Sequence, residues 1–347
     1  MRRSFSLCGF LFAALLLCLF LGGCGKAQDQ NQSESDSQKL RIGFSMATLL
    51  EDRWLQDREI FQARARQRGM EVIIRNANRD SNVQYQQVME LLEQDIDVLV
   101  LAPNDSEREA RCVKLAKEKG VPVIIYDRFI LNSDADVYVS FDNEKVGNLM
   151  AEYLLKQTPK GGYLLVNGPQ SDHNCLMIRD GYMKVLQPYL DKGDIYIVEE
   201  SWTDGWVREL AYDFVSETTK SRGSEINAVI CSNDSLAWGA SEALTEARIL
   251  EQTCIVGMDA DLAACRRIVA DKQLMTVYKP ISLLVEESLN LCEVLAKNEV
   301  VDTTQTLFDG QYDIPHVTID VQAVTKETIK STVIADGFHL EEEVYSK

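Results

Sequence analysis

Short apolar runs alternate with amphipathic stretches along most of the chain. VPVIIY (121–126) has the β-branched content and the length of a single buried strand. NVQYQQVMELLEQ (82–94) instead has its apolar residues at helical spacing, so that Val83, Val88, Leu91 and Leu92 are expected to share one face. Strands like the first example are predicted at 40–45, 71–76, 97–102, 121–126, 137–141, 163–168, 195–200, 226–232, 253–258, 274–279 and 316–321.

This alternation predicts the fold class. Continuous apolar strands separated by helices are typical of parallel sheets that are covered on both faces. The same strand–helix rhythm runs before and after about residue 142. We therefore expect an α/β protein with two similar lobes, each a parallel sheet flanked by helices.

Polar residues follow many of the predicted strands. Ligands of open parallel sheets bind beyond the carboxyl ends of the strands. Asp127 and Arg128 follow the strand at 121–126, and burying this charged pair is costly unless it is satisfied. The strand therefore ends either at the surface or at the floor of a binding site. Comparable residues after other strands are Arg53, Trp54, Asp172, Asn174, Trp202, Asn233, Asp234, Asp259, Asp261 and Lys279.

The residue types at these strand ends favour binding over catalysis. They include no serine–histidine or cysteine–histidine pairing and no metal-ligand cluster, so we expect no cofactor and no metal. Carboxylates accept hydrogen bonds from hydroxyl groups, and Arg and Lys donate to hydroxyl and ring oxygens. An amino acid would also suit this set, through an Arg for its carboxylate and an acid for its ammonium. Trp54 and Trp202, whose indoles suit the C–H face of a pyranose, favour a sugar.

The N-terminus has the pattern of an exported lipoprotein. Arg2 and Arg3 precede an apolar run and small residues, which is typical of a secretory signal at 1–23. LGGC (21–24) resembles a bacterial lipobox, so we expect Cys24 to carry lipid and to anchor the chain at a membrane surface. Residues 24–38 are almost free of apolar side chains and predict a disordered tether.

Charge and cysteine usage narrow the possible partners. The net charge is −18, which argues against nucleic acid and against electrostatic adhesion to anionic lipid. Six cysteines lie beyond the signal and the lipobox, and none forms a CxxC pair. An exported protein can use six cysteines in disulfides. Because several of them lie in apolar strand or helix runs, we favour buried free thiols.

Several blocks of the chain strongly resemble the bacterial periplasmic D-xylose-binding protein family, a group of sugar ABC-transporter receptors with the type I periplasmic-binding-protein fold. The resemblance covers nearly all of residues 40–345. The blocks that carry it are DRWLQDREIF (52–61), YDRFI (126–130), SFDNEKVG (140–147), GYMKVLQPYL (181–190), WTDGW (202–206), SNDSLAWGA (232–240), MDADLAACRRI (258–268), MTVYKPI (275–281) and TIKSTVIADGF (328–338).

The resemblance implies an extracytoplasmic, monomeric receptor that closes two lobes on one pentose and delivers it to an ABC permease. It implies an N-lobe of 39–142 plus 280–312, a C-lobe of 143–279 plus 313–347, and a three-segment hinge. Trp54 and Trp202 would sandwich the sugar ring, and the ring would be bonded by Arg53, Asp127, Arg128, Asp172, Asn174, Asn233, Asp259 and Lys279. Two residues depart from the pattern: Leu50 replaces an expected Arg and His173 an expected Asn.

Other interpretations of the same residues remain open. A lipoprotein of this kind could signal to a membrane histidine kinase or chemoreceptor instead of a permease. A glycosidase would need two carboxylates flanking the scissile bond, a role in which Asp127 and Asp259 could be cast. Asp127 and Arg128 could form only a structural ion pair, and Asn233 could only cap a helix. Trp206 and Trp238 are expected in the core or at the rim.

Overall fold

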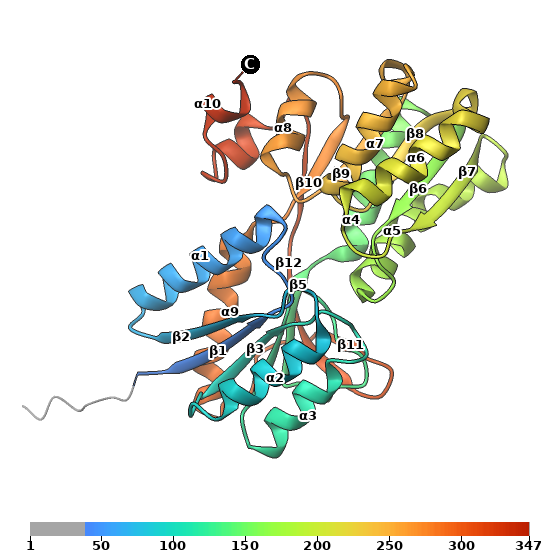
Figure 1. The fold of residues 1–347 in the computed structure, drawn as a ribbon. Helices are drawn as coiled ribbons and strands as arrows, with labels where there is room; N and C mark the ends of the chain where they lie inside the picture. The colour runs from blue at the N-terminus through green and yellow to red at the C-terminus, as the bar shows by residue number, and fades with distance from the viewer. Residues whose placement is uncertain (1–38, 347) are drawn as a thin grey trace, which may run out of the picture. The chain divides into compact units, whose positions relative to one another are not determined.

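The computed structural model describes residues 39–346, and within them two sheets each carry helices on both faces (Figure 1). The predicted fold class of two similar α/β lobes is confirmed. The predictions for residues 1–38, which include the signal peptide, Cys24 and the tether, lie outside the described residues.

The N-lobe sheet has the order β11-β12-β5-β4-β3-β1-β2, and each neighbouring pair is parallel except β11 and β12. Helices α1 and α9 pack on each other over one face, and α2 and α3 cover the other. The strands are β1 (Arg41–Met46), β2 (Glu71–Asn76), β3 (Val98–Ala102), β4 (Val123–Tyr126), β5 (Val137–Phe141), β11 (Thr306–Phe308) and β12 (Asp313–Ile319); the helices are α1 (Asp52–Gln67), α2 (Ser81–Leu92), α3 (Ala110–Glu118) and α9 (Ile281–Ala296).

The C-lobe sheet has the order β13-β10-β9-β8-β6-β7 and is parallel except where β13 pairs with β10. Helices α4 and α5 pack together on this lobe, as do α6 and α7. The strands are β6 (Gly161–Asn167), β7 (Ile195–Trp202), β8 (Ile226–Cys231), β9 (Cys254–Met258), β10 (Met275–Tyr278) and β13 (Gln322–Val324); the helices are α4 (Asn143–Gln157), α5 (His173–Asp191), α6 (Arg208–Arg222), α7 (Asp234–Glu246), α8 (Leu262–Val269) and α10 (Glu341–Val344).

One lobe boundary differs from the sequence-based assignment. Residues from 313 onward were assigned to the C-lobe, but β12 pairs with β5 and β11 in the N-lobe sheet. The third crossover between the lobes therefore follows Ile319. The sequence of β12 conceals this because most of its residues are only half-buried, so its pattern does not indicate which sheet it joins.

Two features of the core hold the elements around the strand ends. Every residue of β3, β4 and β5 is buried, as expected for strands covered on both faces. In the N-lobe, the rings of Phe44 and Phe61 lie 4.7 Å apart and Tyr126 lies 5.1 Å from Phe44. The Tyr126 hydroxyl donates to Asp57, which fixes α1 against the end of β4.

In the C-lobe, α4 and α5 approach closely because of two glycines. A Cβ on Gly147 would lie 2.0 Å from the carbonyl oxygen of Ile178, and one on Gly181 would lie 2.1 Å from that of Glu144. Larger residues would push the helices apart. This contact sets the position of the α5 N-terminus.

The six cysteines within the described residues are free, and all except Cys254 are buried. This agrees with the preference for free thiols. None of the helices within residues 39–346 is long and apolar enough to cross a membrane.

Candidate functional site

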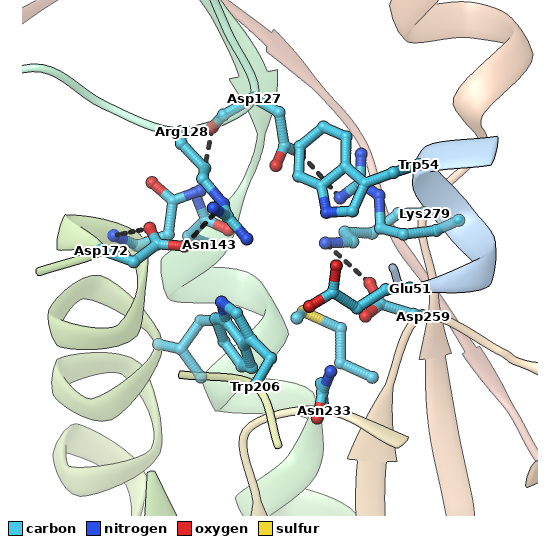
Figure 2. Close-up of a pocket in the computed structure, with 14 residues that line it drawn as sticks. Glu51, Trp54, Asp127, Arg128, Asn143, Asp172, Trp206, Asn233, Asp259 and Lys279 are labelled. Carbon is cyan, nitrogen blue, oxygen red and sulfur yellow. Dashed lines mark hydrogen bonds and ion pairs between the residues drawn. The ribbon is translucent and has the colours of Figure 1, made fainter. Parts of the chain in front are cut away.

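A pocket with about 370 Å³ of empty volume lies at the carboxyl ends of strands from both sheets (Figure 2). It includes Asp127 and Arg128, which follow β4, and Asp259, which follows β9. It is lined by Glu51, Arg53, Trp54, Asp127, Arg128, Asn143, Asp172, Asn174, Ile178, Trp206, Asn233, Met258, Asp259 and Lys279.

Every predicted sugar-binding residue except Trp202 lines this pocket. Trp202 is the last residue of β7, where it is half-buried and packs against the hydrophobic core. Trp206, which was expected in the core or at the rim, is buried in the hydrophobic core and also lines the pocket. Sequence reasoning also missed Glu51, Asn143, Ile178 and Met258.

A turn explains why the second tryptophan of WTDGW reaches the pocket. The Thr203 hydroxyl donates to the carbonyl oxygens of Asn167 and Gly205, at 2.9 and 2.7 Å. Gly205 has a φ of +104°, a backbone conformation that favours glycine. Among residues 39–346, the buried Nε1 of Trp206 finds no hydrogen-bond acceptor. Trp206 therefore presents a free donor at the pocket wall.

Arg53 links α1 to the end of β4. Its Nη1 lies 3.0 Å from Asp127 Oδ1, and its Nε donates to Asp57 at 3.2 Å. Burial would lower the pKa of Arg53, but the Asp127 and Asp57 carboxylates outweigh it and raise that pKa well above its ordinary value. Arg53 is therefore a fixed cation at the pocket wall.

Asp127 is held as a carboxylate. Its φ of +63° is unusual for a residue other than glycine. The Tyr138 and Ser140 hydroxyls both donate to its backbone carbonyl, at 2.8 and 2.6 Å. Burial would raise the pKa of Asp127, but Arg53, Lys279 and Arg128 lower it overall.

Trp54 faces the same charged group. The guanidinium carbons of Arg53 and Arg128 lie 4.3 and 5.0 Å from its ring centroid. These cations hold the indole at the pocket edge (Figure 2).

Residues at the N-terminus of α5, in the C-lobe, contact residues of the N-lobe. Asp172 accepts from the Asn174 backbone N–H at 3.1 Å, which caps α5, and its other oxygen lies 2.8 Å from Arg128 Nε. The Asn174 amide donates to the Asp127 carbonyl at 2.8 Å, and its oxygen accepts from the Phe129 N–H at 3.3 Å. Burial raises the pKa of Asp172 despite the opposing charge of Arg128.

The C-lobe side of the pocket carries a second ion pair. Lys279 Nζ lies 2.8 Å from Asp259 Oδ1, and both side chains are buried. Asn233 caps α7 by accepting from the Leu236 N–H at 3.0 Å, and it also lines the pocket. Capping and pocket lining are therefore compatible at this position.

Asp234 and Asp261, two other strand-end residues, do not line the pocket. The Asp234 carboxylate accepts from Thr276, Gln273 and the Asp261 N–H, at 2.8, 2.8 and 3.1 Å. Burial raises the pKa of Asp234 to about 7. This pair therefore organises the loop that carries Asp259.

The pocket carries paired charges that suit a neutral polar ligand. The Asp127, Asp172 and Asp259 carboxylates each face one cation of the pocket wall, namely Arg53, Arg128 and Lys279. Within residues 39–346, no group of three or more His, Cys, Asp or Glu residues is arranged to hold a metal ion. The donors and acceptors can serve hydroxyl groups without a net charge on the ligand.

Comparisons with known proteins show the family of this chain. A family model described as a periplasmic binding protein domain matches residues 42–299. The D-xylose-binding periplasmic protein of Haemophilus influenzae is 40% identical over 313 residues, covering 90% of this chain and 94% of that protein. The Escherichia coli protein of the same name is 39% identical over 308 residues, covering 89% and 93%. These are binding proteins and not enzymes.

Solved structures show the same fold. A carbohydrate transporter solute-binding protein from Chloroflexus aurantiacus, in complex with D-glucose, has a TM-score of 0.84 at 26% identity. An ABC transporter solute-binding protein from Clostridium phytofermentans, with bound β-D-glucose, has a TM-score of 0.83 at 28% identity. Each match covers 88% of this chain, and 98% and 99% of the respective neighbour.

Proposed function

This chain belongs to the periplasmic binding protein family, within it to the D-xylose-binding proteins, and we propose that it binds D-xylose between its two lobes and delivers it to an ABC importer. The observation that carries the proposal is the convergence of polar strand ends from both lobes on one pocket.

The proposed contacts follow from the pocket walls. The indoles of Trp54 and Trp206 cover the sugar ring, with Trp206 in the role first given to Trp202. The Trp206 Nε1–H, which lacks a partner among residues 39–346, donates to a sugar oxygen. The remaining contacts come from Arg53, Asp127, Arg128, Asp172, Asn174, Asn233, Asp259 and Lys279.

The choice of D-xylose rests on the names of the two relatives that are about 40% identical. Neighbours with the same fold hold D-glucose, so the fold alone does not select a pentose. Transport is favoured over sensing because both structural neighbours are described as transporter solute-binding proteins. Closure is a population shift that is limited by the preference of the sugar for the closed form.

The proposal places the chain outside the cytoplasm as a monomer held at the membrane by lipid on Cys24. The support is the LGGC sequence after an apolar run, together with the periplasmic relatives. The three chain crossovers after β5, β10 and β12 would form the hinge.

A thermal-shift screen of the chain from residue 39 onward tests the proposal. A ligand that binds only the folded state raises the melting temperature, and at equal concentration a tighter ligand raises it more. We expect D-xylose to give the largest shift in a panel with D-glucose, D-ribose and L-arabinose. A larger shift with another sugar would contradict the xylose assignment, and no shift with any sugar would contradict sugar binding.

A further inference from the structure

Glu51 enters the pocket although no strand-end pattern points to it. It directly precedes α1 with an extended backbone, φ −82° and ψ 139°. Its side chain makes no capping hydrogen bond to the helix. Instead it lines the pocket, with only 13% of the side chain exposed (Figure 2).

The neighbouring residue explains why Glu51 was missed. The resemblance leads us to expect arginine at position 50, but Leu50 is 67% exposed and does not line the pocket. The same short loop thus turns residue 50 towards solvent and residue 51 towards the pocket.

The two oxygens of Glu51 have different surroundings. Oε1 accepts from Arg79 Nη2 at 2.5 Å, whereas Oε2 is buried and, among residues 39–346, has no hydrogen-bond partner. A buried carboxylate oxygen without a donor is costly. Arg79 does not line the pocket, and its bond to Oε1 leaves Oε2 unpaired within the described residues.

Arg79 is positioned to hold Glu51 in place. Asn78 and Arg79 both have positive φ, +50° and +66°, and the Arg79 N–H donates to the Ala47 carbonyl at 2.8 Å. This ties the loop to the end of β1. The Arg79 guanidinium also lies near the C-lobe, since a Cβ on Gly205 would be 3.5 Å from its Nη1. The pair Glu51–Arg79 therefore stands at the rim beside Trp206.

We propose that Glu51 is a sugar-contacting, specificity-determining residue, whose Oε2 accepts a hydrogen bond from one hydroxyl of the bound monosaccharide while Oε1 stays on Arg79. This inference rests on the proposed function. Because Arg79 holds the Glu51 carboxylate in place through Oε1, the other oxygen, Oε2, requires a hydrogen-bond donor at one point of the pocket. It therefore selects sugars that place a hydroxyl there and discriminates against those that lack it.

The test is a double-mutant cycle between the protein and the sugar. Glu51→Gln keeps the shape, but with its oxygen on Arg79 it offers the sugar a neutral donor in place of a charged acceptor. The probes are D-xylose and its analogues that each lack one hydroxyl. Glu59→Gln, which changes an exposed carboxylate on the helix α1 that follows Glu51, is the matched control. Melts without sugar establish that each variant is folded.

We expect Glu51→Gln to weaken D-xylose binding about tenfold or more, because hydrogen bonds to charged groups are the stronger ones. Glu59→Gln should bind as wild type. For one analogue, the loss of binding free energy from the missing hydroxyl and the loss from Glu51→Gln should not add. Unchanged affinity in Glu51→Gln, or losses that add for every analogue, would overturn the inference and leave the proposed function intact. A wild-type chain that binds no monosaccharide would overturn both.

Discussion

Asp127 and Asp259 occupy equivalent positions in the two lobes. Each directly follows a buried strand, with positive φ of +63° and +98°. Each donates its backbone N–H over 2.9 Å to the next strand, Asp127 to Val139 and Asp259 to Val277. Such conformations are uncommon outside glycine and are concentrated at functional sites. The charged residues that follow the strand in VPVIIYDRFI (121–130) therefore line the pocket from the N-lobe, as Asp259 does from the C-lobe.

This equivalence leads to a prediction for Asp127→Asn. The amide oxygen can still accept from Arg53, but the charged acceptor for a sugar hydroxyl is lost. Hydrogen bonds to charged groups contribute about 1.5–3 kcal/mol, so we expect D-xylose affinity to fall at least about tenfold. The free energy of unfolding should fall by only about 1–3 kcal/mol, because Arg53 keeps Asp57.

Calorimetric titration of this variant checks the loss of D-xylose affinity, and urea unfolding checks the change in the free energy of unfolding. Asp271→Asn is the control, since that carboxylate is 74% exposed and pairs with Lys326 away from the pocket. Wild-type affinity in Asp127→Asn would mean that Asp127 serves only the buried ion pair.

Ser106 bonds the N-lobe to the C-lobe away from the pocket. Its N–H and hydroxyl donate to the Ser171 carbonyl at 2.8 and 2.9 Å, and its hydroxyl accepts from the His173 N–H at 2.8 Å. Ser106→Ala removes both hydroxyl bonds, each worth about 0.5–1.5 kcal/mol. We expect sugar dissociation about tenfold faster, with association little changed.

Stopped-flow tryptophan fluorescence measures both rates for Ser106→Ala. Ser288→Ala is the matched control, because its buried hydroxyl bonds only to Leu284 within α9. Equal dissociation rates in the two variants would show that the Ser106 contacts do not stabilise the sugar-bound state.

The buried imidazole of His316 should make the stability of the folded chain sensitive to acid. Burial lowers its pKa from 6.5 to about 4, against the opposing effect of Asp142. The unfolded chain takes up this proton near pH 6.5 but the folded chain only near pH 4. The stability from neutral His316 is thus complete above pH 6.5 and is lost as pH falls towards 4.

His316→Phe should keep the stack on Tyr138, where the rings lie 4.7 Å apart, but cannot titrate. We expect the stability lost between pH 7 and pH 4.5 to be smaller in the variant by roughly 2 kcal/mol. Urea unfolding at the two pH values gives this difference. Identical losses in both proteins would contradict the neutral, buried state of His316.

Cys24→Ala tests the membrane anchor in cells that express the full chain. Without the cysteine, the lipoprotein signal peptidase has no modified substrate, so the precursor should persist uncleaved and carry no diacylglycerol. Gel mobility and labelling with a radioactive fatty acid report both changes. A Cys24→Ala chain that is labelled and processed as wild type would exclude Cys24 as the lipid site.

The sequence predicted much of the fold because fully buried parallel strands leave an unambiguous apolar signature. The strands at 71–76 and 137–141 have the bounds that were expected. β11 and β13 were missed, since each has only three residues. β12 was found but was assigned to the wrong lobe, because most of its residues are only half-buried and their pattern carries little information about its partner strands.

At the pocket, the sequence identified residues that directly follow strands but not those placed by turns. Trp206 is brought in by the positive φ of Gly205, and Glu51 by a loop whose neighbouring Leu50 faces solvent. Asn143, at the start of α4, reaches the pocket from a crossover between the lobes. These placements depend on backbone geometry, which the spacing of apolar residues along the sequence does not reveal.

The most direct test of the account is a calorimetric titration of the wild-type chain with D-xylose at neutral pH. We expect one site per chain, with a Kd of about 0.1–10 μM, which corresponds to roughly −8 kcal/mol. The absence of any heat with D-xylose at millimolar concentration, from protein shown to be folded by its melt, would contradict it.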